Sequence, residues 1–111
     1  MILGVGIDLV EITRIEAAMN IDGFAERILT DGERERKLSI HYVAGRWAAK
    51  EAAKKVIPAL NSWHQIEVLT ADSGAPYAVI HGGALAPGTK LHLSISHDAR
   101  FAVAVAILES V

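Results

Sequence analysis

Two carboxylates that lie far apart in the sequence are the residues best suited to chemistry. Asp8 follows Gly4 and Gly6 on one face of a predicted N-terminal strand, and Glu51 lies in the middle of a predicted long helix. Glycine in a strand often marks the close approach of another backbone or a ligand, so Asp8 should have space beside it. Together the carboxylates would make an oxygen site for a hard cation such as Mg²⁺, which keeps water and phosphate oxygens as further ligands. Zinc does not fit, because the chain has no Cys and its His residues are scattered.

The predicted long helix places further side chains beside Glu51. Alanine dominates residues 43–55 and no proline interrupts them, which favours a helix. Trp47, Glu51 and Lys55 are spaced by four residues, so they share one side of that helix. The alternative is an ordinary amphipathic helix with solvated charges and a Glu51–Lys55 pair. In that case Asp8 would only cap the segment that follows the first strand.

Charge is unevenly distributed along the chain. The net charge is −2 at pH 7, yet residues 34–55 carry seven Lys or Arg against two Glu. A basic segment on an otherwise acidic protein indicates an anionic partner. Nucleic acid is not expected as that partner, because the few aromatic residues are scattered and do not alternate with basic ones.

Length and hydropathy set further limits. A chain of 111 residues is expected to form a single domain, 1–111. No uninterrupted apolar run approaches the roughly 20 residues that cross a bilayer, so no membrane association is expected. The first residues contain no basic segment typical of a signal peptide. With no Cys to form disulfides, a cytoplasmic location is expected.

The periodicity predicts the elements that must position Asp8 and Glu51. Apolar alternation and turn residues predict strands at 2–10, 63–70, 76–80, 91–96 and 101–108. Helical periodicity and helix breakers predict helical segments at 11–19 and 24–29. A capping box at 30–33 predicts the start of a further helical region that runs to 57 with a bend near 39. The last strand has only alanine on one face, so the long helix should pack closely against it. The predicted fold class is α+β, one long helix packed on a mostly antiparallel sheet of about five strands.

Three blocks in this order resemble the holo-acyl-carrier-protein synthase family of 4′-phosphopantetheinyl transferases. They are Gly6-Ile7-Asp8 in the first strand, Trp47-Ala48-Ala49-Lys50-Glu51-Ala52 in the helix, and Ser94-Ile95-Ser96-His97 at a strand end. Residues 24–30 and 72–76 match two further landmarks of the family. Each motif is weak alone, but five in order across nearly the whole chain are specific. The family's fold and its homotrimer, with active sites between subunits, are therefore expected.

The resemblance implies a reaction and a catalytic site. A serine of an acyl carrier protein would attack the β-phosphate of coenzyme A, receive the 4′-phosphopantetheine arm and release 3′,5′-ADP, as fatty acid biosynthesis requires. Asp8 and Glu51 would bind Mg²⁺, with Mn²⁺ as a substitute, and the pyrophosphate of coenzyme A would complete the shell. Lys55 would be the third catalytic residue, because it can neutralise phosphate charge. The serine proton would pass to a water held by Mg²⁺ and Asp8, or to Glu51 itself.

Basic residues form two predicted binding groups. Those suited to the phosphates of coenzyme A lie on the long helix: Arg46, Lys50, Lys54 and Lys55. The resemblance adds His97 near the nucleotide, although a lone His at a strand end is more often structural. Arg14 and Arg27 suit the acidic helix of a carrier protein. The alternative for each basic residue is a solvated charge.

One segment departs from the family pattern. After the Lys-Glu-Ala helix the family has a Gly-rich turn that approaches the coenzyme A phosphates, whereas residues 56–62 contain no glycine. Gly74-Ala75-Pro76 also stands where the family usually has Gly-Lys-Pro. The missing turn motivates an alternative function, a non-catalytic coenzyme A-binding, nucleotide-binding or assembly module that has kept the fold and lost turnover.

Overall fold

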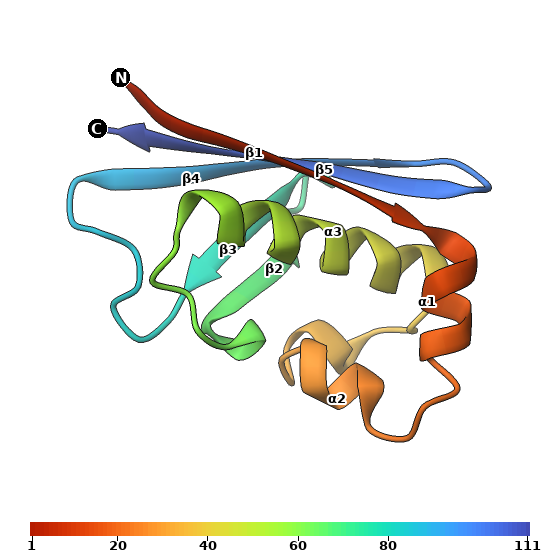
Figure 1. Ribbon diagram of the computed structural model, residues 1–111. Helices are drawn as coiled ribbons and strands as arrows, with labels where there is room; N and C mark the ends of the chain where they lie inside the picture. The colour runs from red at the N-terminus through yellow and green to blue at the C-terminus, as the bar shows by residue number, and fades with distance from the viewer.

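One long helix lies beside two antiparallel sheets in the computed structural model, which describes all residues, 1–111 (Figure 1). The first sheet has the strand order β1-β5-β4, formed by β1 (Ile2–Glu11), β5 (Phe101–Ser110) and β4 (Thr89–His97). The second sheet is a hairpin of β2 (Ile66–Thr70) and β3 (Pro76–Ile80). The predicted α+β class is confirmed, with its five strands divided between two sheets.

Helical segments occupy the chain between β1 and β2. They are α1 (Ile12–Ala18), α2 (Phe24–Ile28), the 3₁₀ turn η1 (Glu33–Glu35), the long helix α3 (Ile40–Val56) and the 3₁₀ turn η2 (Trp63–Gln65). Thr30 and Glu33 form the predicted capping box, but it starts only the short turn η1. The long helix begins one residue after Ser39, whose hydroxyl accepts a hydrogen bond from the backbone N–H of Tyr42 at 3.2 Å.

Small side chains let α3 pack closely on the three-stranded sheet. Alanines are buried on both sides of this contact: Ala48, Ala49, Ala52 and Ala53 on α3, and Ala102, Ala104 and Ala106 on β5. The predicted contact between the long helix and the alanine face of the last strand is therefore confirmed. Gly6 marks the closest approach of β1 to the helix, since a methyl group there would lie 2.3 Å from the Ala52 carbonyl oxygen.

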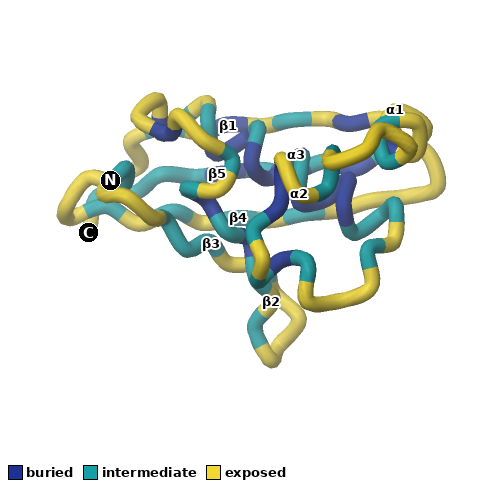
Figure 2. The backbone as a smooth tube through the Cα atoms, turned by 90° about the horizontal axis from the view of Figure 1, so that it is seen from below, coloured by how far each residue is buried: buried dark blue, intermediate teal, exposed yellow.

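The opposite face of the same sheet is not covered by any element. Leu3, Val5, Ile7 and Leu9 of β1 are each more than half exposed on this face. In Figure 2 the connecting loops are exposed and buried segments gather around α3. A row of exposed apolar side chains on a regular sheet is unusual for a monomer. None of the helices is long and apolar enough to cross a bilayer.

Candidate functional site

Asp8 and Glu51 line one recess of about 310 Å³ between β1, α1, α2 and α3. Asp8 is paired with Ala104 on the neighbouring strand β5, and Ala104 is buried against α3. Since directly paired residues share one face of a sheet, Asp8 points to the helix side. α3 brings Glu51 to the same recess, together with Trp47 from one turn earlier. Apart from Arg14 and the two carboxylates, the recess is lined by apolar residues: Leu9, Val10, Ile15, Ala18, Phe24 and Trp47.

The two carboxylates lie close enough in this recess for the charge of one to act on the other. Burial raises the pKa of Glu51 above its usual value, the negative charge of Asp8 raises it further, and Lys55 opposes both. Lys55 is half exposed, and its Nζ donates to the Ile7 carbonyl oxygen at 2.5 Å and to Asp8 Oδ1 at 3.5 Å. The structure therefore brings together the three residues predicted to be catalytic.

The donors in this recess fit Mg²⁺ or Mn²⁺. The chain has no group of three or more His, Cys, Asp or Glu side chains that could hold a metal ion. Zinc usually takes three or four such ligands. Mg²⁺ instead uses one or two carboxylates and keeps open positions for water and substrate phosphate oxygens. Burial and the nearby charge of Asp8 both raise the pKa of Glu51, and a cation bound between the two carboxylates would favour its ionised form.

Aromatic side chains form one wall of the recess. The ring of Phe24 packs edge-on against Trp47 at 6.5 Å between centroids, and Trp63 packs behind Trp47 at 4.7 Å. Arg14 and Arg27, the predicted carrier-protein contacts, are both exposed, and the Arg27 guanidinium lies 6.0 Å from the Phe24 ring centroid. The sequence did not predict that Trp63 supports this wall from behind Trp47, since nothing local indicates that η2 folds back onto α3.

Arg46 and His97 meet in a second recess of about 410 Å³. Arg46 is fixed there by donating Nε to the Val68 carbonyl oxygen at 3.2 Å and a terminal nitrogen to Thr70 Oγ1 at 2.6 Å. The ring of His97 lies 5.2 Å from that of His41, a residue the sequence did not single out. These two rings and the guanidinium give this recess donors that suit an anion.

The two recesses lie on different sides of α3. Arg46 and Glu51 are five residues apart, which corresponds to a rotation of about 140° around a helix. Helix geometry alone could have separated these residues, but the sequence prediction grouped them by charge. A single ligand would have to pass around α3 to contact both within one chain.

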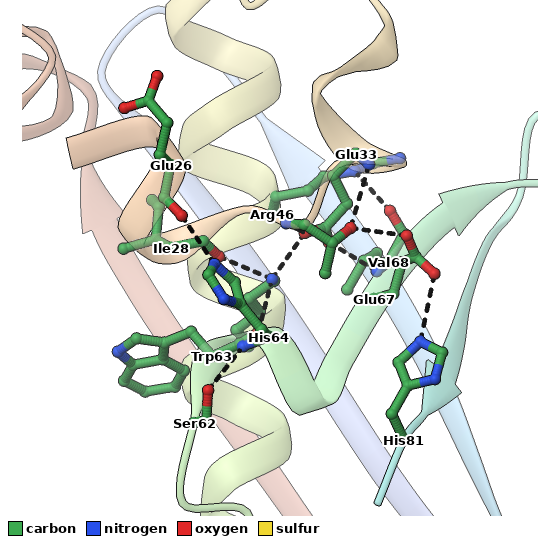
Figure 3. A network of polar contacts seen from close by, with 12 residues as sticks. Glu26, Ile28, Glu33, Arg46, Ser62, Trp63, His64, Glu67, Val68 and His81 are labelled. Atoms are coloured by element: carbon green, nitrogen blue, oxygen red, sulfur yellow. Dashed lines mark hydrogen bonds and ion pairs between the residues drawn. The ribbon is translucent and has the colours of Figure 1, made fainter. Parts of the chain in front are cut away.

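Lys50 lies in neither recess. Its side chain is fully buried, and Nζ donates to Glu33 Oε1 at 2.7 Å, the Ile28 carbonyl oxygen at 2.7 Å and the Trp63 carbonyl oxygen at 2.9 Å (Figure 3). Burial lowers the pKa of Lys50, and the negative charge of Glu33 opposes that effect. The structure corrects the prediction that Lys50 binds coenzyme A, because all three ammonium hydrogens are used inside the protein.

The loop after α3, which lacks the family's Gly-rich turn, is held by hydrogen bonds with Lys54 and Gln65. Lys54 Nζ donates to the carbonyl oxygens of Pro58, at 3.1 Å, and of Leu60. Gln65 Oε1 accepts the backbone N–H groups of Asn61 at 2.7 Å and Ser62 at 3.1 Å. These two N–H groups are therefore already paired, so phosphate contacts near this loop would fall to the side chains of Lys54 and Lys55.

Comparisons with known proteins agree with this arrangement. The model of the 4′-phosphopantetheinyl transferase superfamily matches residues 4–106. A holo-[acyl-carrier-protein] synthase of Shouchella clausii is 41% identical, covering 99% of this chain and 100% of the relative. That of Natranaerobius thermophilus is 40% identical, covering 99% of each.

Two crystal structures extend the comparison to the fold. The synthase of Bacillus anthracis in complex with coenzyme A (3′,5′-ADP) superposes with a TM-score of 0.86 and 42% identity, covering 100% of this chain and 99% of that one. The synthase of Helicobacter pylori in complex with coenzyme A gives 0.82 and 30%, covering 96% and 100%. The matched residues include both recesses of the present structure. The chain therefore belongs to the 4′-phosphopantetheinyl transferase superfamily.

Proposed function

We propose that this chain is a holo-acyl-carrier-protein synthase. It transfers the 4′-phosphopantetheine group from coenzyme A to a serine of an acyl carrier protein and releases 3′,5′-ADP, which activates the carrier for fatty acid biosynthesis. The observation that carries this proposal is the meeting of Asp8 and Glu51 in one open recess beside Lys55. Relatives that align along their full length and are named as this synthase support it.

The residues at the first recess have different roles in phosphoryl transfer. Asp8 and Glu51 would hold Mg²⁺, and the bound ion would supply positive charge for the pyrophosphate. Lys55, half exposed at the edge of the recess, contributes positive charge to the phosphate or the leaving oxygen. The serine proton passes to a water held beside Asp8 or to Glu51 itself, and both carboxylates line this recess.

Coenzyme A is held between two copies of the chain in this proposal. Arg46 and His97 of one copy supply hydrogen-bond donors for its nucleotide phosphates. Lys55 of the neighbour lies beside Asp8, and Lys54 follows Trp47 and Glu51 on the same helix. Support comes from the separation of the two recesses around α3. The exposed apolar row on β1 supplies a face for the assembly. The family resemblance implies that this assembly is a homotrimer.

The carrier protein docks over α1 and α2 in this proposal. Arg14 and Arg27 are exposed beside the first recess and suit an acidic helix. Contacts of this kind chiefly raise the association rate and weaken with salt.

Mass spectrometry tests the reaction. The protein is incubated with an apo acyl carrier protein, coenzyme A and Mg²⁺, and the carrier should gain the mass of one phosphopantetheine arm. Coenzyme A binding without that gain, across several carrier proteins, would refute the proposal in favour of a binding module. Sedimentation showing only monomer at micromolar concentration would refute the shared site.

A further inference from the structure

The buried pair Lys50–Glu33 is a charged network that the proposed chemistry does not use. Both side chains are fully buried. Glu33 also accepts backbone N–H groups, that of Thr30 through Oε1 and that of Val68 through Oε2, each at 2.7 Å. Every hydrogen of the ammonium group and both carboxylate oxygens are therefore engaged, in directions that the acceptors and donors fix.

This network joins segments that are far apart in the sequence. Figure 3 shows Ile28, Glu33 and Trp63 converging from α2, η1 and η2. Lys50 connects all three of them to α3, one residue before Glu51. The same segments support the aromatic wall of the first recess, because Phe24 on α2 lines it and Trp63 on η2 packs against Trp47.

Stability alone does not explain such a pair. Two buried charges carry a large desolvation penalty, and apolar residues of similar size are often at least as stabilising. Apolar contacts would, however, allow α3 to slide or rotate against α2 and η2. Directional hydrogen bonds from a charged group hold one arrangement.

We infer that Lys50 and Glu33 are a positioning pair for the proposed metal site. They fix the rotation of α3 against α2 and η2, so that Glu51 faces Asp8 across the recess. This inference rests on the proposed function, because it assumes that Asp8 and Glu51 bind the metal. It assigns to Lys50 an indirect role, acting through the position of Glu51.

Metal binding by an uncharged version of the pair tests the inference without relying on turnover. The double variant Glu33→Gln/Lys50→Met leaves no unpaired buried charge, and Kd for Mn²⁺ is measured by electron paramagnetic resonance well below its Tm. We expect Kd for Mn²⁺ to rise about tenfold or more, as a misplacement on the scale of 1 Å can do. Binding of 3′,5′-ADP without metal should stay unchanged, since Arg46 and His97 lie on another side of α3.

Val43→Ala is the matched control. Val43 is fully buried on α3 and contributes no side-chain hydrogen bond to the network. It should lower Tm and leave Kd for Mn²⁺ unchanged, which separates positioning from general loss of stability. Should the double variant not fold, Glu33→Asp keeps both charges but shortens the reach by one methylene, and it is held to the same expectation.

Two results would contradict the inference in different ways. A folded variant of the pair with wild-type Kd for Mn²⁺ would overturn the positioning role and leave the proposed function intact. A wild-type protein that does not bind Mn²⁺ would overturn the proposed metal site itself, and the inference with it.

Discussion

Gly6→Ala should damage the fold and the reaction together. The new methyl carbon would lie 2.3 Å from the Ala52 carbonyl oxygen, whereas carbon–oxygen contacts are normally about 3.3 Å or longer. β1 and α3 would therefore have to separate by about 1 Å, because both groups belong to backbone held in regular structure. Gly6 does not have a positive φ, so this contact and not a backbone conformation is what requires glycine.

The size of the effect follows from this separation. Overpacking of this kind costs about 1–3 kcal/mol. Since 1 kcal/mol shifts Tm of a domain of this size by about 4–8 °C, Tm should fall by roughly 5–20 °C. Asp8 lies two residues beyond Gly6, so the same shift should move it away from Glu51 and lower kcat/KM by about 10–100-fold.

Gly4→Ala is the control on the same strand face. Its methyl group would meet the Val56 side chain at 3.2 Å, which is a milder contact that can relax. We expect a loss below about 1 kcal/mol for this variant and near-normal transfer. Thermal unfolding and the mass-spectrometric transfer assay compare the two variants. A Gly6→Ala protein with the Tm and kcat/KM of Gly4→Ala would refute the account of how β1 and α3 hold the site.

Four further predictions concern the site and the sheet. The pKa of Glu51 is raised, and only its ionised form binds metal, so the Mg²⁺ concentration for half-maximal activity should rise as pH falls. The midpoint of this pH dependence should lie above the usual Glu pKa of 4.5, and a midpoint at or below that value would be contrary evidence. For the same reason the metal-free fold carries a penalty at pH 7 that is lost as pH falls through the raised pKa, so Glu51→Gln should raise Tm without metal. Arg14→Glu and Arg27→Glu should raise KM for the carrier protein and not for coenzyme A in steady-state kinetics, and equal changes in both would argue against the docking surface. Val5→Glu on the exposed sheet face should yield monomers in sedimentation and lose transfer, whereas an unchanged assembly would exclude that face as the interface.

The sequence predicted the parts of the fold that depend on local patterns. Alternation placed β1 and β5, and the alanine face of β5 identified the contact with α3. The division into two sheets had no such signal, because it depends on where the chain leads after β3. The helix boundary at Ser39 was only partly foreseen, since the capping box at Thr30 starts a separate turn.

The candidate site likewise contains residues that local patterns predict and one whose position they do not. Asp8, Glu51 and Lys55 meet because a strand face and a helical spacing of four residues bring them together, and both are visible in the sequence. Lys50 was misjudged because a lysine next to a predicted metal ligand looks exposed. Its burial depends on Glu33, and no local pattern shows that η1 reaches the interior.

The central claim is that Asp8 and Glu51 act as one metal site, and a double-mutant cycle tests it most directly. Neither side chain makes a short hydrogen bond to the fold, so Asp8→Ala, Glu51→Ala and the double variant should all remain folded. Each single change should lower kcat/KM by about 100-fold or more, and the two losses should not add, because both remove the same bound ion. Activity should require Mg²⁺ or Mn²⁺ and vanish in EDTA. Full transfer by folded Asp8→Ala, additive losses, or activity that persists in EDTA would contradict the claim.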